Sequence, residues 1–167
     1  MGKAKAKRQA HIKSATNVVK LNNFLPKKQR NVDILPRNRN QEEYILELLS
    51  EDKDIVFGIG PAGTGKTLLA CQAAVKAFLE GEVDRIIVTR PAVSADEDIG
   101  FLPGTLEEKM APWTRPIFDV LREYFYSGEI EGMIKEGVIE ISPLAYMRGR
   151  TFKDAYIIAD EMQNATP

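Results

Sequence analysis

The sequence has very few thiol and imidazole groups: Cys71 is the only cysteine and His11 the only histidine among 167 residues. One cysteine excludes an internal disulfide and a cysteine-based metal site. One histidine is too few for a histidine-based zinc site, and it makes a Ser-His-Asp triad improbable because only His11 could serve as its base. We therefore expect the chemistry of this chain to depend on other side chains.

Long apolar runs are also missing. No stretch approaches the roughly 18 consecutive apolar residues that predict a membrane-spanning helix. The basic N-terminus is not followed by the apolar region of a secretory signal. We therefore expect no membrane partner and a cytoplasmic location. The length, with 44% hydrophobic residues, is typical of a single globular domain.

Acidic residues are absent from residues 1–32, which contain nine lysines and arginines, so all 24 acidic residues follow later in the chain. Residues 1–36 are polar and show no sustained period, which predicts a basic, disordered arm before a domain over residues 37–167. Basic arms often contact the phosphate backbone of nucleic acids. The alternative is a solvated tail that only aids solubility.

Strand-like apolar runs alternate with helix-like periods along the domain. We predict strands at 54–59, 85–89, 138–141 and 155–159, and helices that begin at Asn40, at Lys66, at the capping residue Thr114 and near residue 129. Residues 91–113 are expected to form a long ordered loop with one helical turn. Alternation of this kind predicts an α/β fold with a mostly parallel sheet covered on both faces.

Eight consecutive residues match the phosphate-binding pattern G-x-x-x-x-G-K-[ST]: Gly60, Pro61, Ala62, Gly63, Thr64, Gly65, Lys66 and Thr67. Glycines allow backbone N–H groups to turn toward phosphate oxygens, and the following helix adds its positive end. Lys66 reaches the β- and γ-phosphates and the Thr67 hydroxyl ligates Mg²⁺. The segment therefore predicts binding of a nucleoside triphosphate, ATP with Mg²⁺; an ordinary glycine turn is the alternative.

A second segment fits the same chemistry. The apolar residues 156–159 are followed by Asp160 and Glu161. A buried parallel strand delivers such carboxylates to the edge of the sheet where ligands bind. Asp160 is predicted to hold Mg²⁺, and Glu161 to act with Lys66 in catalysis as the general base for a water. Any buried strand that ends in a polar turn can produce this pattern. The prediction therefore depends on the phosphate-binding pattern upstream, at residues 60–67.

The chain resembles the PhoH family from about Asn40 onward, in five segments that occur in the family's order and spacing: 59–66, 88–92, 100–104, 146–151 and 160–164. The resemblance implies a three-layer RecA-like P-loop NTPase core, similar to the first motor domain of superfamily 1 helicases. Family members are ATP-binding proteins and ATPases linked to RNA metabolism, and several phages carry them. The resemblance thus implies an ATPase coupled to single-stranded RNA, which forms a homo-oligomer, such as a ring, in its complete form. For a phage-encoded chain, the location would be the host cytoplasm.

The resemblance also gives roles to single residues. Gln41 occupies the place of a glutamine that reads adenine, with an exposed first-turn residue as the alternative. Arg90 would contact the nucleic-acid backbone, or else form a structural ion pair. Arg148 and Arg150 flank Gly149, and paired arginines suit phosphate oxygens of RNA or of a neighbour's nucleotide, with a pair of surface charges as the alternative.

The segment after Asp160 and Glu161 contains two further candidates, Gln163 and Asn164, as sensors of the γ-phosphate. Family members continue beyond the position of Pro167 with a threonine-arginine segment and a Gly-Asp-x-x-Gln segment. We therefore expect the RecA-like core to be incomplete at its C-terminus, with nucleotide binding better retained than turnover. The last strand would then be an uncovered edge.

Two other functions remain open at this point. A nucleotide-dependent nucleic-acid-binding module without motor activity needs only the loop and the basic residues. A P-loop kinase needs an acceptor pocket and a mobile arginine-rich lid, for which the sequence offers only Arg148 and Arg150.

Overall fold

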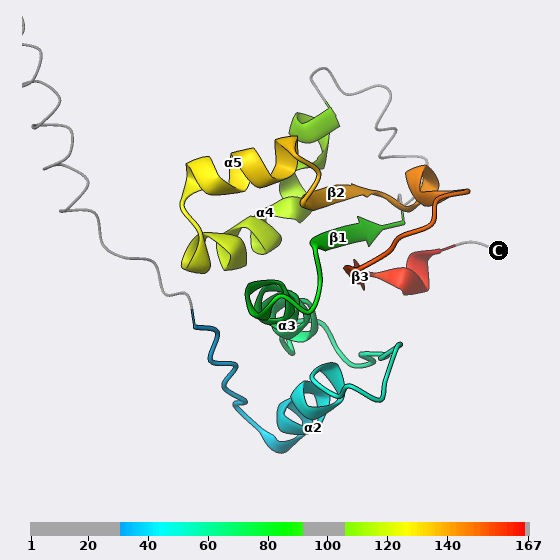
Figure 1. The fold of residues 1–167 in the computed structure, drawn as a ribbon. Helices are drawn as coiled ribbons and strands as arrows, with labels where there is room; N and C mark the ends of the chain where they lie inside the picture. Colours follow the sequence, from blue (N-terminus) through cyan, green and yellow to red (C-terminus); the bar gives the residue numbers. More distant parts are fainter. Residues whose placement is uncertain (1–30, 92–105, 166–167) are drawn as a thin grey trace, which may run out of the picture.

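Helices and strands alternate along the chain in the computed structural model, which describes residues 31–91 and 106–165, with the backbone alone at 106–112 (Figure 1). The elements are the helices α2 (Arg39–Leu48), α3 (Lys66–Glu80), α4 (Leu106–Tyr124) and α5 (Ser127–Lys135), the strands β1 (Arg85–Arg90), β2 (Ile139–Pro143) and β3 (Ala155–Ala159), and the 3₁₀ helices η1 (Leu144–Met147) and η2 (Met162–Asn164). The predicted α/β class is confirmed.

The three strands form one open, all-parallel sheet in the order β2-β1-β3. Val88 at the centre of β1 pairs with Ile141 of β2 on one side and Ile158 of β3 on the other. Parallel neighbours require crossover connections, and α4 with α5 supplies the one from β1 to β2. The arrangement is part of a RecA-like P-loop core.

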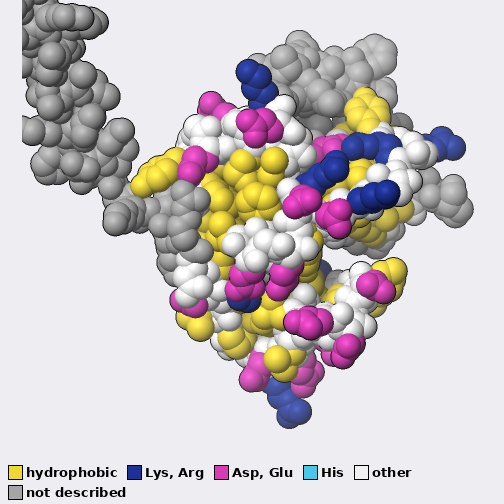
Figure 2. All heavy atoms as spheres, viewed as in Figure 1, with side chains coloured by type: hydrophobic (Ala, Val, Ile, Leu, Met, Phe, Trp, Pro, Cys, Tyr) yellow, Lys and Arg dark blue, Asp and Glu magenta, His cyan; other side chains and the backbone are white. Residues whose placement is uncertain are grey.

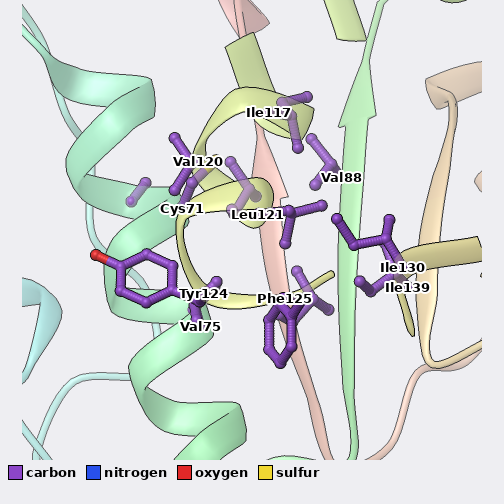
Figure 3. Close-up of a cluster of buried hydrophobic side chains, with 14 of the residues drawn as sticks. Cys71, Val75, Val88, Ile117, Val120, Leu121, Tyr124, Phe125, Ile130 and Ile139 are labelled. Atoms are coloured by element: carbon purple, nitrogen blue, oxygen red, sulfur yellow. The ribbon is translucent and has the colours of Figure 1, made fainter. Parts of the chain in front are cut away.

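One face of the sheet carries the hydrophobic core (Figure 3). Because side chains alternate along a strand, Val88, Ile139 and Ile158 share this face. The helices α3, α4 and α5 pack on it with buried residues such as Val75 and Leu121. Full burial of a side chain of this size contributes about 1.5–3 kcal/mol, so this layer holds the fold together.

The other face of the sheet is more polar. Glu140 and Ser142 of β2 lie there, opposite in the alternation to Ile139. The Ser142 hydroxyl is 3.8 Å from the Met147 sulfur, and the carboxylate of Glu140 is bound by Arg150. The crossover from β2 to β3 therefore lies against this face, while the three helices lie against the opposite one.

The predicted start of α4 at Thr114 is wrong, because the helix begins eight residues earlier, at Leu106. Thr114 lies inside α4 and is buried, and Pro116 is also in the helix interior. A proline there removes one helical hydrogen bond, at a cost of roughly 3 kcal/mol. Burial of the apolar face of α4, with Ile117 and Leu121, offsets that cost.

The cap of α2 also differs from the prediction. Asn38, and not Asn40, is the N-cap: its side chain accepts a hydrogen bond of 2.9 Å from the backbone N–H of Gln41. Both asparagines suit the position by residue type. The extended backbone at Asn38 decides between them, since an N-cap lies outside helical geometry.

Residues 54–59 form no strand, which corrects the prediction for this segment. Among the described residues, none has a backbone hydrogen bond to this segment, and Ile55, Phe57 and Ile59 are exposed. An apolar pattern of this kind forms a strand only where a neighbouring strand supplies the hydrogen bonds.

The packed part of the chain begins before the predicted boundary at residue 37. Val32 is buried in the core cluster and Ile34 packs against it. The rest of the predicted arm, residues 1–30, lies outside the described part of the chain. None of the described helices combines the length and hydropathy that crossing a bilayer requires.

Leu121 is 2% exposed at the centre of the core, so Leu121→Ala is expected to lower the free energy of unfolding by about 2–5 kcal/mol. Urea denaturation followed by circular dichroism measures this change. Leu46 is 65% exposed on α2, and Leu46→Ala is the matched control, with an expected change within about 0.5 kcal/mol. Equal losses in the two variants would contradict this assignment of the core.

Candidate functional site

The glycine-rich loop turns sharply between the 54–59 segment and α3. Gly63 and Gly65 have φ angles of 76° and 87°, in the left-handed region that favours glycine. The Thr64 hydroxyl donates a hydrogen bond of 2.9 Å to the Pro61 carbonyl and closes the turn. Gly65 is the N-cap of α3, so the loop ends at the positive end of a 15-residue helix.

The side chain of Lys66 lies across this loop. Its ammonium donates to the carbonyls of Gly60 and Pro61, each at 2.8 Å. These carbonyls belong to exposed residues, so water can replace the ammonium when it turns toward a phosphate. The lysine is thus held where the backbone N–H groups and the helix end also attract an anion.

Thr67 and Asp160 meet although they are 93 residues apart: the Thr67 hydroxyl donates to a carboxylate oxygen of Asp160 at 2.8 Å. The N–H of Asp160 also bonds the Thr89 carbonyl at 2.8 Å, which fixes Asp160 at the end of β1. A hydroxyl and a carboxylate are oxygen donors of the kind that Mg²⁺ prefers. The described residues contain no group of three or more His, Cys, Asp or Glu able to hold a metal, so phosphate and water would supply the other ligands.

The backbone at Glu161 is strained. Its φ of 51° and ψ of 35° are left-handed, which is uncommon for a residue with a side chain. Such a conformation costs of order 1–3 kcal/mol and often occurs at functional sites. Gln163 donates a hydrogen bond to the Glu161 carboxylate, and Asn164 bonds the Glu161 carbonyl through its backbone N–H at 3.0 Å. Both predicted sensor residues therefore lie in η2, directly beside Glu161.

Gln41 joins α2 to the loop. Its amide nitrogen donates to the Thr64 carbonyl at 2.9 Å, and its amide oxygen accepts from the N–H of Arg37 at 2.8 Å. A Cβ at Gly65 would lie 3.2 Å from the same amide nitrogen. The residue predicted to read adenine is thus next to the nucleotide loop, with both ends of its amide engaged by backbone groups.

The three arginine candidates are not equivalent. Arg90 ends β1, and Arg148 is exposed beside Gly149; neither forms an ion pair within the described part of the chain. Lys and Arg side chains gather over this part of the surface, near η1 and the connection to β3 (Figure 2). Within the described residues, the guanidinium groups of Arg90 and Arg148 are therefore not engaged by a carboxylate.

Arg150, in contrast, is held by Glu140 of β2. One of its nitrogens lies 2.8 Å from a carboxylate oxygen, and a second nitrogen binds the other oxygen. The guanidinium also lies over the Phe152 ring, 4.7 Å from its centroid. The hydrogen bond from Arg150 is the main cause that holds the pKa of Glu140 below its ordinary value. In this arrangement Arg150 fastens the β2–β3 crossover to the sheet.

Sequence reasoning gave no role to two residues that the structure brings to the site. Thr89 is 3% exposed, and its hydroxyl has no hydrogen-bond partner within the described residues, although its carbonyl anchors Asp160. Tyr44 lies close to Gly58, in the segment that leads into the loop, and burial, then Cys71 and Asp160, raise the pKa of its hydroxyl. For Thr89, the sequence signal that could have indicated a role was its position directly before the candidate residue Arg90.

The strand order, the glycine-rich loop and the adjacent Thr67 and Asp160 define the class: an α/β P-loop protein with a partial RecA-like core. The chain belongs to the PhoH family, since the family model described as "PhoH-like protein" matches residues 33–167.

Several bacterial proteins are similar to it. A PhoH-like protein of Bacillus subtilis is 49% identical over 143 residues, which cover 86% of this chain and 44% of that protein. A PhoH-like protein of Mycobacterium tuberculosis is 51% identical over 138 residues, with coverages of 83% and 39%. Protein PhoH of Escherichia coli is 47% identical over 135 residues, with coverages of 80% and 38%. The chain thus spans less than half the length of these relatives.

The hydroxyl of Thr89, which has no hydrogen-bond partner among the described residues, gives a stability prediction. Thr89→Val replaces a buried, unsatisfied group by a methyl of similar shape, and we expect the free energy of unfolding to rise by about 1 kcal/mol. Ser142→Ala is the contrast: its hydroxyl donates to Glu140 at 3.2 Å, so this variant should lose stability. Thermal denaturation measures both, and a destabilised Thr89→Val would show that the hydroxyl has a partner.

The contact between Arg150 and Glu140 gives a pH prediction. Since the folded-state pKa of Glu140 is lowered, the pair stabilises the fold above the unfolded-state pKa, and this contribution is lost as pH falls through the folded-state pKa. Arg150→Met should raise the pKa of Glu140 and remove that pH dependence. Carboxyl NMR titration measures the pKa, with Arg148→Met as the control. A Glu140 pKa that stays low in Arg150→Met would refute the assigned cause.

Proposed function

We propose that this chain binds ATP together with Mg²⁺ at the loop formed by residues 60–67. The observation that carries the proposal is the hydrogen bond between Thr67 and Asp160, which brings two oxygen ligands to the mouth of the loop. A glycine turn without function would not need a carboxylate from a strand 93 residues away. Bound Mg²⁺ would supply positive charge beside the β- and γ-phosphates.

Each side chain of the site has a part in this proposal. The loop N–H groups and the N-terminus of α3 bind the phosphates, and Lys66 turns from the Gly60 and Pro61 carbonyls to the β- and γ-phosphates. Thr67 and Asp160 hold the metal. Gln41 presents its amide beside the loop, where exchange of the Thr64 carbonyl for the adenine edge costs no net hydrogen bond.

We further propose that the protein hydrolyses ATP, with Glu161 as the general base. Its carboxylate takes a proton from the attacking water, whose oxygen bonds to the γ-phosphorus while the bond to the β-phosphate oxygen breaks and ADP leaves. Gln163 orients that carboxylate through its amide. The transition state also needs a positive group near the γ-phosphate. Because Arg150 is engaged by Glu140, Arg148 of a neighbouring subunit in a homo-oligomer is the better candidate.

We propose that hydrolysis is coupled to single-stranded RNA and that the protein acts in the cytoplasm. Arg90 and Arg148 support it, since both are free of ion pairs in the described residues and lie at or beyond the ends of strands on the side of the sheet where Asp160 lies. The free guanidinium of Arg148 equally favours the second candidate, a nucleic-acid-binding module without motor activity. The kinase hypothesis loses support, because Arg150 is unavailable for a lid.

Single substitutions separate these functions. Lys66→Ala should weaken ATP binding by roughly tenfold to a hundredfold, as expected for the loss of a charge-assisted contact worth about 1.5–3 kcal/mol. Asp160→Asn should reduce the Mg²⁺ dependence of binding. Isothermal titration calorimetry with and without Mg²⁺ measures both effects. Lys76→Ala is the matched control, since Lys76 lies on the same helix, α3, and pairs with Glu80 away from the loop.

Hydrolysis and RNA coupling need a second measurement, phosphate release with and without single-stranded RNA. Glu161→Gln should keep ATP affinity and lose turnover, and stimulation by RNA should disappear in both Glu161→Gln and Lys66→Ala. RNA binding that is unchanged in both variants, without phosphate release, would favour the binding module. ATP affinity equal in wild type, Lys66→Ala and Lys76→Ala would refute the proposed nucleotide site.

A further inference from the structure

The helix α2 directs one face toward the rest of the molecule. Gln41, Tyr44 and Ile45 are separated by three and four residues, the spacing that places side chains on one side of a helix. Ile45 is the buried residue of α2, whereas Leu46, outside this face, is 65% exposed. In Figure 1, α2 lies beside α3, and the chain that joins the two helices contains the whole glycine-rich loop. The inner face of α2 is therefore directed toward α3 and the loop.

Gln41 holds the end of the loop that leads into α3. Its amide nitrogen donates a hydrogen bond of 2.9 Å to the Thr64 carbonyl, and a Cβ at Gly65 would lie 3.2 Å from that nitrogen. Its amide oxygen accepts from the N–H of Arg37 at 2.8 Å, which orients the amide. One end of the loop is thus held by a side chain of α2.

Tyr44 lies against the chain at the other end of the loop, at Gly58. A Cβ at Gly58 would lie 3.0 Å from the Tyr44 hydroxyl oxygen, 3.1 Å from its Cζ and 3.2 Å from its Cε2. These distances are shorter than ordinary van der Waals contact, so the ring occupies the space that a side chain at position 58 would need. Gly58 does not share the positive φ of Gly63 and Gly65. The Tyr44 ring, and not the backbone conformation, therefore accounts for a glycine at this position.

The Tyr44 ring also borders the residues around Asp160. Burial, then Cys71 of α3, then Asp160 raise the pKa of its hydroxyl. Burial, then Tyr44, raises the pKa of Tyr156 in β3 to about 12. The ring is thus surrounded by α3, by β3 and by the segment that leads into the loop. Its position depends on the same two elements that bring Thr67 and Asp160 together.

The segment that leads into the loop has little other support among the described residues. None of them forms a backbone hydrogen bond with residues 54–59. Ile55, Phe57 and Ile59 are 74%, 82% and 94% exposed, so the large side chains of this segment add little packing. The ring beside Gly58 is therefore a contact that can fix the path of the chain into the loop.

We propose that α2 is a two-point clamp on the glycine-rich loop, in which Tyr44 is a positioning residue that sets the path of Gly58 while Gln41 holds the Thr64 carbonyl. The clamp fixes where the loop begins relative to the first turn of α3, whose N–H groups point to the same anion site. A loop that is held at both ends keeps its N–H groups converged before a ligand arrives. Such preorganisation lowers the conformational cost of binding.

The consequence for the ligand rests on the proposed function, binding of ATP with Mg²⁺ at residues 60–67. Tyr44 acts on the phosphates through the loop and does not contact the adenine base. Loss of its ring should therefore weaken the binding of ATP and of inorganic tripolyphosphate by the same factor. If the population of the aligned loop falls from nearly one to about a tenth, the affinity for each ligand falls about tenfold.

The first measurement needs no nucleotide. In the full 167-residue chain, ¹⁵N relaxation reports the order of the backbone N–H groups of Gly60, Gly63 and Gly65. Tyr44→Ala should lower that order, and Tyr44→Phe should preserve it because the ring remains. Leu46→Ala, on α2 but outside its inner face, should leave it unchanged. Loop order that is the same in wild type and Tyr44→Ala would overturn the inference.

A variant on the loop side tests the same contact without removing any packed atom. Gly58→Ala should push the ring and the loop apart and weaken the binding of both ligands. In the Tyr44→Ala background the added methyl has space, so it should have little further effect. Gly132→Ala is the matched control, since a Cβ there meets no described atom within 4 Å. If Tyr44→Ala does not fold, the comparison of Gly58→Ala with Gly132→Ala decides alone.

Isothermal titration calorimetry with Mg²⁺ and either ATP or tripolyphosphate measures the affinities, and circular dichroism checks that each variant is folded. A Gly58→Ala effect of equal size with and without the Tyr44 ring would overturn the clamp. Weaker binding of ATP alone in Tyr44→Ala would assign the ring to the adenine base and would overturn it as well. A wild-type chain that binds neither ligand, with loop order that depends on Tyr44, would support the clamp and contradict only the proposed function.

Discussion

The hydrogen bond from Thr67 to Asp160 ties the first turn of α3 to the end of β3, and the site depends on this contact. It forms because the parallel strands deliver their carboxyl ends to one edge, where α3 begins. Asp160 is fixed from its other side by the Thr89 carbonyl of β1, the most buried strand. The packing of α3 and α4 on the sheet therefore brings a hydroxyl and a carboxylate together, 2.8 Å apart.

Several polar side chains around this contact have structural partners as well as proposed functional ones. Gln41 holds the loop by its Thr64 carbonyl, and Arg150 holds the β2–β3 crossover by Glu140. These contacts are on the surface, where ion pairs and hydrogen bonds contribute little net stability. The single hydrogen bond from Gln41 to the Thr64 carbonyl can therefore be exchanged for a ligand at small cost, whereas Arg150 is held by two hydrogen bonds to Glu140. The left-handed backbone at Glu161 is different, since its cost is paid whether or not a ligand is bound.

Apolar side chains are buried on one side of the molecule and exposed to water on another. The face of the sheet against α3, α4 and α5 buries a continuous core, whereas Ile157 and the alternate residues of 54–59 remain in water. The glycine-rich loop, residues 60–67, follows this uncovered segment directly. The helices α3, α4 and α5 thus stabilise the core, whereas the start of the glycine-rich loop is joined to a segment, residues 54–59, that packs little apolar surface.

The sequence by itself determined the α/β class, β1, β2, β3 and α3, and the loop over residues 60–67, because these depend on local period and on glycine geometry. The partners of polar side chains required the tertiary structure. Nothing local told Arg150 from Arg148, or Asn38 from Asn40, since residue type was the same and only the surrounding backbone differed. Residues 54–59 have the apolar pattern of a strand, but no described strand lies beside them to supply hydrogen bonds. Thr114 lies inside α4, because burial of the apolar face of this helix offsets the cost of its prolines. Local patterns state what a segment can form; long-range contacts decide whether it does.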